Sequence, residues 1–307
     1  MSRRDGVMVP DAEPRTYYDL PILKEPVWKW EIPAYFAAGG LAAGSSLLAA
    51  GADLVGNRPL ARRAQATSFV ALGASGVLLV ADLGVPSRFH HMLRVAKPTS
   101  PMNVGSWLLA AFALPTTVAT ASSLLGVLPR AGRVARLAAA ALAPAVATYT
   151  GVLVADTAVP VWHEARRVLP ALFAAGAAAS AGGVALVVVD PADSGPARRL
   201  ALVGVLGEAV AMLAMERELG DFVARPYHSD RVARLRRSAL ACNAVGAVLL
   251  LGGRWTRRAG AVLGGMLVVT ASVVERFAVV EAGRESARDP AYTVGPQHNG
   301  AAMTTPR

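Results

Sequence analysis

Charged residues are scarce in this chain. Of its 307 residues only 17% are Asp, Glu, Lys or Arg, whereas 54% are hydrophobic. Soluble domains carry about 25% charged residues, and a soluble bundle of Ala-rich helices needs a charged face that repeats at the helical period. The long apolar segments show no such face. The composition therefore favours an integral membrane protein over a soluble helical bundle.

Cysteine is almost absent, since Cys242 is the only one in the chain. One thiol cannot build a four-Cys iron–sulfur cluster, a Cys-based zinc site or an internal disulfide. Because Cys242 falls within an apolar run, we interpret it as a small buried residue.

Histidine is missing from the apolar segments. A membrane b-type haem needs axial histidines that project from helices into the bundle core. All five histidines fall in predicted loops, which excludes a bis-His haem: His90, His91, His163, His228 and His298. The chain also lacks a metal-ligand spacing and a phosphate-binding glycine loop. It has no basic soluble domain to present a groove to nucleic acid, so the net charge of +10 is assigned to membrane loops.

A secretory signal is not evident either. Residues 1–32 mix acidic and basic residues and contain no apolar h-region, so the first apolar run is expected to direct insertion. A spanning helix needs about 20 predominantly apolar residues. The sequence predicts an all-α membrane protein with eight transmembrane helices, the sixth and seventh of them short, at residues 33–55, 66–83, 106–128, 136–155, 168–189, 200–215, 238–252 and 259–280.

An internal repeat divides these helices into two halves. A constant offset of 137 aligns residues 33–97 with the second half without a gap. The matches include Pro33 with Pro170, Asp53 with Asp190, and His91 with His228. Two four-helix bundles of the same direction are the expected result of such a duplication. The predicted division is an extramembrane segment 1–32, a first half 33–155, a second half with its connecting loop 156–281, and a tail 282–307.

Small residues in the first apolar run predict a central helix. Gly40 and Gly44 form a GxxxG pattern, which lets helices approach closely in a membrane. An even number of spans places both termini and the long connections on one side. Lys and Arg are more numerous in the long segments but denser in the short links, so the positive-inside rule gives no orientation.

Ionisable residues inside the apolar runs are functional candidates, because an unpaired charge there is costly. For Glu275 and Arg276 we expect structural ion pairs with other helices. Glu208 suits either a hydrogen bond that locks the bundle or a proton relay. The aspartates at segment ends, among them Asp82 and Asp156, suit either interfacial capping or proton handling. The hydroxyls of Tyr35 and Tyr149 need partners, and either a helix or a quinone carbonyl would serve.

The most polar stretch of the first half runs from Asp82 to Trp107. Within it Arg88, His91, Arg94 and Lys97 recur at every third residue, before Pro98 and Pro101 turn the chain. This pattern indicates a basic loop at a membrane surface, suited to an acidic partner. His90 and His91 are either a surface pair or a hydrogen-bond and proton donor at the mouth of a site.

This stretch, DLGVPSRFHHMLRVAKPTSPMNVGSW, resembles the signature of the NrfD-like family of polysulfide reductase membrane subunits. In that family an Asp-Leu-Gly leads through a basic loop to a Ser-Pro-Met and a Gly-Ser-Trp. WEIPAYFAAGGLAAGSSLLAAGADL resembles the family's first span, and YTGVLVADTAVPVWHEARRVLPALF, from Tyr149, resembles its fourth span and following loop. The resemblance covers most of residues 28–290.

The resemblance implies a haem-free subunit of a bacterial cell-membrane redox complex, without an iron–sulfur cluster of its own. Such subunits use menaquinone or ubiquinone as substrate. They exchange electrons with a ferredoxin-like iron–sulfur subunit, often serving a molybdopterin catalytic subunit. The implied quinone ligands are Glu31, Tyr35, Arg88, His91 and Tyr149, and the implied proton carriers are Asp82 and Asp156, to which the buried Glu208 is added. Some family members carry Asn or His near the start of the first span, where this chain has Trp30, Glu31 and Tyr35.

Chemistry assigns roles to these residues. Tyr149 and His91 would donate to the two quinone carbonyls, Arg88 would stabilise negative charge on the ring, and Asp82 or Asp156 would relay protons. Two other functions fit the same apolar pattern. A secondary transporter also uses repeats and buried acids, although Pro115 and Pro144 have no counterparts in the second half. A bare membrane anchor for a redox partner would need no site at all.

Overall fold

A computed structural model describes residues 22–252 and 257–293. These ranges are almost entirely helical and contain no strand. Three short helices lie in the connections: η2 (Pro86–Leu93), α5 (Pro160–Glu164) and η3 (Arg225–His228). The long helices in these ranges are α1 (Glu31–Leu54), α2 (Arg58–Ala81), α3 (Pro101–Leu125), α4 (Pro129–Ala155), α6 (Leu169–Val188), α7 (Gly195–Val223), α8 (Asp230–Leu251) and α9 (Arg257–Arg288).

Six of the long helices are apolar and long enough to cross a membrane, namely α1, α2, α3, α4, α6 and α9. This confirms an all-helical, multi-pass membrane protein and bears out six of the eight predicted spans. The other two helices, α7 and α8, are long enough to cross a membrane but are not apolar enough. Charged residues occupy both ends of α7, and the first two turns of α8 carry Asp230 and four arginines.

Several helices extend beyond the predicted apolar runs. Helix α7 covers 195–223 where 200–215 was predicted, and α9 continues to Arg288, past the predicted start of the tail at 282. Hydropathy marks only the apolar part of a helix. Arg, Glu and Ala at the ends are good helix formers, so they continue the helix into polar surroundings.

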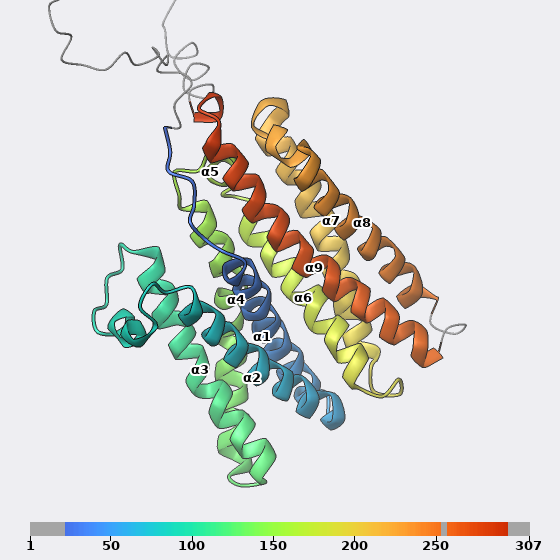
Figure 1. Ribbon diagram of the computed structural model, residues 1–307. Coiled ribbons are helices and arrows are strands. Elements are labelled where there is room, and N and C mark those ends of the chain that lie inside the picture. Colours follow the sequence, from blue (N-terminus) through green and yellow to red (C-terminus); the bar gives the residue numbers. More distant parts are fainter. Residues whose placement is uncertain (1–21, 253–256, 294–307) are drawn as a thin grey trace, which may run out of the picture.

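The long helices lie side by side, with α1, α6 and α9 in the middle (Figure 1). In the first half α1 packs against α2 and α4, and α3 packs against α4. In the second half α6 packs against α7 and α9, and α8 packs against α9. The second and third helices of each half touch little, and a cavity lies between α2 and α3 and another between α7 and α8.

Helix α1 packs against α2, α4, α6 and α9, and so has the central position that its small residues predict. A Cβ atom at Gly44 would lie 2.3 Å from the carbonyl oxygen of Ala177 and 2.9 Å from the Cβ of Ala181. Gly40 faces the same residue, at 3.4 Å from the Ala177 Cβ. Close approach of the two backbones therefore depends on glycine in α1.

Both ends of the described chain lie at the same end of the bundle, as predicted from an even number of long helices. Arg288 at the end of α9 donates two hydrogen bonds, of 3.0 and 2.7 Å, to the carboxylate of Glu25. Nearby, the Trp28 ring stacks on Trp162 at 5.3 Å between centroids. Trp162 is fully buried, and its ring fits only because Gly283 has no side chain.

The substitution Gly44→Ala should loosen the contact between the halves. Its Cβ meets backbone of α6, so we expect the variant to lose about 1–3 kcal/mol of stability, measured by thermal unfolding of the detergent-solubilised protein. Gly51→Ala is the matched control, because nothing lies within 4 Å of a Cβ at that position of α1. Equal unfolding midpoints for the two variants would contradict the importance of this contact.

Candidate functional site

Two predicted carboxylates come together at the long-loop end of the first half. Glu31 is the first residue of α1, and Asp82 directly follows α2. Burial raises the pKa of the Asp82 carboxyl; a main-chain hydrogen bond from Lys29 opposes this rise, and the nearby Glu31 charge adds to it. One Glu31 carboxylate oxygen is buried without a hydrogen-bond partner. Asp82 therefore holds a proton more readily than an ordinary surface carboxyl.

A narrow crevice that contains the two predicted tyrosines lies between the helices. It is lined by Tyr35, Ser75, Gly105 and Tyr149 among others, and its volume is about 10 Å³. The crevice holds no more than a water molecule. The Tyr149 hydroxyl donates a hydrogen bond of 2.5 Å to the carbonyl oxygen of Pro101, and this bond links α4 to α3. A Cβ at Gly105 would lie 2.0 Å from the Tyr149 ring and hydroxyl, so only glycine leaves room for this phenol.

A much larger cleft of about 710 Å³ separates α2 from α3. Its polar lining residues are Ser106 and Thr117, and the rest are apolar or glycine. Phe69 and Val77, which also line it, are 40% and 69% exposed, so the cleft opens on the outer surface of the bundle. Leu109 lines both the cleft and the crevice. The Leu109 side chain thus borders both the apolar slot and the crevice that contains the predicted tyrosines.

The roof of this cleft is η2, and its geometry explains the spacing of Arg88 and His91, whereas Arg94 and Lys97 follow its last residue. A 3₁₀ helix has three residues per turn, so residues three apart share a face. Phe89 and Met92 line the cleft, whereas Arg88 and His91 are exposed. The His91 ring lies 4.4 Å from that of His90, with its Nδ1 3.4 Å from an Arg94 nitrogen. The predicted ligands Arg88 and His91 therefore sit on the outer face of the roof.

Residues of the signature stretch hold this roof in place. The side chain of Asn103 donates to the carbonyl of Met92 at 2.9 Å and accepts from the main-chain N–H of Lys97 at 2.6 Å. The indole of Trp107 donates to the carbonyl of Val95 at 3.3 Å. The first turns of α3 thus position the whole loop from residue 86 to residue 97.

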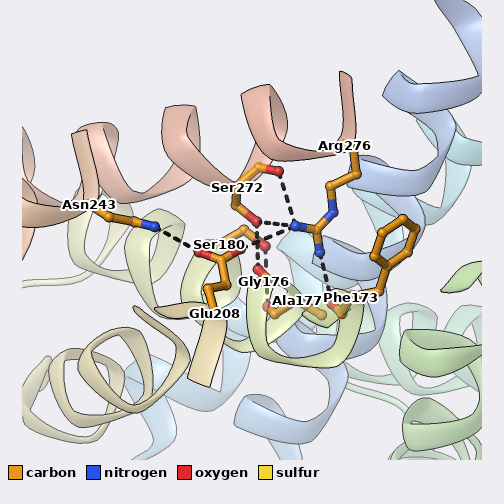
Figure 2. A network of polar contacts seen from close by, with 8 residues as sticks. All are labelled: Phe173, Gly176, Ala177, Ser180, Glu208, Asn243, Ser272 and Arg276. Atoms are coloured by element: carbon orange, nitrogen blue, oxygen red, sulfur yellow. Dashed lines mark hydrogen bonds and ion pairs between the residues drawn. The ribbon is translucent and has the colours of Figure 1, made fainter. Parts of the chain in front are cut away.

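The other two predicted proton carriers lie apart from this site. Asp156 ends α4 and is exposed. Glu208 is buried in the second half, in a polar network drawn in Figure 2. The Arg276 guanidinium donates to Glu208 at 3.2 Å, to the Ser272 hydroxyl at 3.0 Å and to the Phe173 carbonyl at 2.8 Å.

This network reaches every long helix of the second half. Asn243 of α8 donates to the second carboxylate oxygen of Glu208 at 3.0 Å, and Ser272 of α9 donates to the carbonyl of Gly176 in α6 at 2.9 Å. A Cβ at Gly176 would lie 2.1 Å from the Arg276 guanidinium, so the network also needs glycine there. The predicted ion pair of Arg276 is confirmed. In this structure Glu208 acts as a lock between helices.

Glu275 forms no ion pair within the described part of the chain, contrary to expectation. Instead it lines the cavity of about 440 Å³ between α7 and α8, with one buried carboxylate oxygen lacking a hydrogen-bond partner. Tyr227 lines the same cavity and is fully buried; burial raises its pKa, Glu275 adds to the rise and Arg236 opposes it. The position of Glu275 in an apolar run led to the prediction of an ion pair. The sequence does not show which side chains of the neighbouring helices face Glu275.

Sequence reasoning missed the α2–α3 cleft and Leu109, Ser75 and Tyr227. One signal was available for the cleft. Gly73 and Gly76 lie three residues apart in the second apolar run, hence on one helix face, and both line the cleft. Two glycines on one face of a spanning helix mark either a close helix contact or a hollow, and here nothing lies within 4 Å of a Cβ at either position.

Removing the Glu208 charge should destabilise the second half. The substitution Glu208→Gln leaves Arg276 as a buried unpaired charge, which costs about 3–5 kcal/mol. The double variant Glu208→Leu with Arg276→Met should recover most of this loss, because no buried charge remains. Unfolding midpoints in detergent measure both effects, with the exposed Glu164→Gln as control. A double variant less stable than either single variant would contradict the role of the ion pair.

The chain matches the profile of the family described as "Polysulphide reductase, NrfD" over residues 21–284, which is most of its length. No curated protein sequence matches it.

Proposed function

The chain belongs to the NrfD polysulphide reductase family, whose members are membrane subunits of redox complexes, and from this premise we propose that it binds a membrane quinone and oxidises or reduces it. In this proposal α7 and α8 also cross the membrane, which gives eight spans in two four-helix halves. The subunit would sit in the bacterial cell membrane and use menaquinone or ubiquinone as its substrate.

The observation that carries the proposal is the apolar cleft between α2 and α3. Its volume of about 710 Å³ falls in the range of about 300–1,000 Å³ that is typical of small-molecule sites. An isoprenoid quinone reaches such a slot from the lipid, because Phe69 and Val77 expose its opening. The lining is almost free of polar groups, which suits the tail and the faces of the ring.

In this proposal, the tyrosines of the crevice next to Leu109 provide hydrogen-bond donors for the carbonyl groups of the quinone ring. The crevice between Tyr35 and Tyr149 is too small for a quinone ring in this structure, and Leu109 lines both it and the cleft. We propose that Leu109 moves aside to admit the ring. A ring that displaces Leu109 meets the Tyr149 hydroxyl, which can exchange its bond to Pro101 for one to a quinone carbonyl. Asp82, near the surface and partly buried, then passes protons between this site and water.

Electrons must come from a partner, since a chain with one cysteine holds no four-Cys cluster. The exposed face of the roof carries Arg88, His91 and Arg94. We assign this basic face to a ferredoxin-like iron–sulfur subunit with acidic contacts, linked in turn to a molybdopterin catalytic subunit. A docked cluster would then lie just above the cleft, which keeps the electron path short.

Filling the cleft should weaken quinone binding without unfolding the protein. Gly76 lines the cleft with open space around its Cβ position, so Gly76→Leu occupies the slot without a clash. Competition with the ring and tail should raise the Kd for a menaquinone analogue at least about tenfold, one lost hydrophobic contact being worth about 1–3 kcal/mol. Titration of the purified protein in detergent measures this.

Gly51→Leu is the matched control, because its side chain also points into open space but away from the cleft. It should bind the analogue like the wild type. Unchanged affinity in Gly76→Leu would argue for a bare membrane anchor, or for a quinone site elsewhere in the complex.

Asp82→Asn should change how quinol oxidation depends on pH. A carboxyl accepts a proton only when ionised, and the pKa of Asp82 is raised. The wild-type rate should therefore fall towards acid as Asp82 becomes protonated. The variant should be slower at neutral pH by about 10²-fold and should lack the acidic limb. Stopped-flow assay of the assembled complex measures both profiles, and an unchanged acidic limb in Asp82→Asn would exclude Asp82 as proton acceptor.

A further inference from the structure

A basic cavity opens at the opposite end of the first half, where the helices are joined by short links. Its volume is about 480 Å³, and it lies between α1, α2, α3 and α4. Five arginines and one aspartate line it: Arg58, Arg62, Arg130, Arg133, Arg136 and Asp53. Cavities in membrane proteins are seldom so rich in one charge, since each unpaired ion near the membrane is costly.

The aspartate in this lining already forms ion pairs with two of the arginines. Asp53 accepts from Arg136 at 3.1 Å and from Arg133 at 3.2 Å. Arg136 is 9% exposed and also donates to the Gln65 side chain at 3.3 Å. Among the described residues, Arg58, Arg62 and Arg130 form no ion pair. The cavity therefore keeps a buried, structured floor and an excess of positive charge at its mouth.

The N-terminus of helix α4 adds to this positive potential. Helix α4 begins at Pro129, which lines the cavity, whereas the first N–H groups of α2 already donate to Gly56 and Asn57. Free N–H groups in the first turn of a helix and the helix dipole favour a bound anion. Helix α4 lacks a side-chain cap at Leu128, so its first N–H groups are open to an external acceptor. Ser123 brings a hydroxyl donor to the same wall.

Exposed apolar side chains surround the cavity. Leu54, Leu124, Leu125 and Leu128 lie next to lining residues in sequence and are 71–75% exposed. Leucines this exposed at a helix end suit contact with acyl chains. A phosphate within reach of unpaired arginines and a hydrocarbon chain along the leucines would satisfy both parts of this surface together.

We propose that this cavity binds the phosphate headgroup of an anionic phospholipid. Arg58, Arg62 and Arg130 contact the phosphate oxygens, and the ion pair of Asp53 with Arg136 holds the floor. Arginine suits this role because its planar guanidinium can bind two phosphate oxygens at once. Anionic lipids concentrate in the cytoplasmic leaflet, so the short-link end of the bundle would face the cytoplasm and the quinone end the opposite side. The site is independent of quinone chemistry.

The test compares lipid binding by the wild type and a triple variant with Arg58→Gln, Arg62→Gln and Arg130→Gln. The full chain is purified in detergent, and the rise in its unfolding midpoint is titrated with phosphatidylglycerol, phosphatidylcholine and inorganic phosphate. Basic residues near the membrane surface attract anionic lipid, so the triple variant should need more than about tenfold more phosphatidylglycerol for the same rise.

The matched control removes three charges from the other end of the bundle, by Arg217→Gln, Arg225→Gln and Arg234→Gln. It should respond to phosphatidylglycerol like the wild type. An equal loss in this control would overturn the proposal, because net charge alone would then explain binding. Stabilisation by inorganic phosphate equal to that by phosphatidylglycerol would also overturn it, by showing a site for soluble anions. Native mass spectrometry of the wild type should retain one phosphatidylglycerol that the triple variant lacks.

Discussion

The structure of the second half depends on the pairing of Arg276 with Glu208. A guanidinium in a bundle core must find an anion and further acceptors, because an isolated charge in apolar surroundings is prohibitively expensive. No single neighbour satisfies it. Its partners come from α6, α7 and α9, and Asn243 of α8 completes the carboxylate. Satisfying one charge thus fixes the relative rotation and depth of four helices.

The first half also contains a buried arginine that is paired with an acidic residue, but this pair lies near one end of the helices. Arg136, near the start of α4, pairs with Asp53 of α1 and bonds Gln65 of α2, which in turn donates to Thr120 of α3. This network ties the four helices together at the short-link end. The other ends of α2 and α3 are left free to diverge. The apolar cleft opens at that end, so the position of the lock decides where a hydrophobic ligand can bind.

The two proposed binding sites therefore lie at opposite ends of the first half. Its long-loop end has an apolar slot, two nearby carboxylates and a basic roof, which suit a quinone and an electron-transfer partner. Its short-link end has an excess of arginine, which suits a lipid phosphate. The second half has a smaller cavity that holds Glu275 and Tyr227.

The amino-acid sequence by itself determined the class of the protein, the existence of the long helices and the central position of α1. These follow from apolar runs and small-residue spacing, which are local properties. The spacing of three between Arg88 and His91 was also local, and the 3₁₀ helix η2 contains both residues. The sequence identified Arg276 and Glu208 as buried charges, but only the tertiary structure paired them across 68 residues. The tertiary structure also made Phe89 part of the cleft wall and left Arg88 and His91 exposed, outside that wall. Which side chains meet depends on the rotation of each helix about its axis and on its shift along its neighbours. No local sequence pattern encodes this rotation or shift.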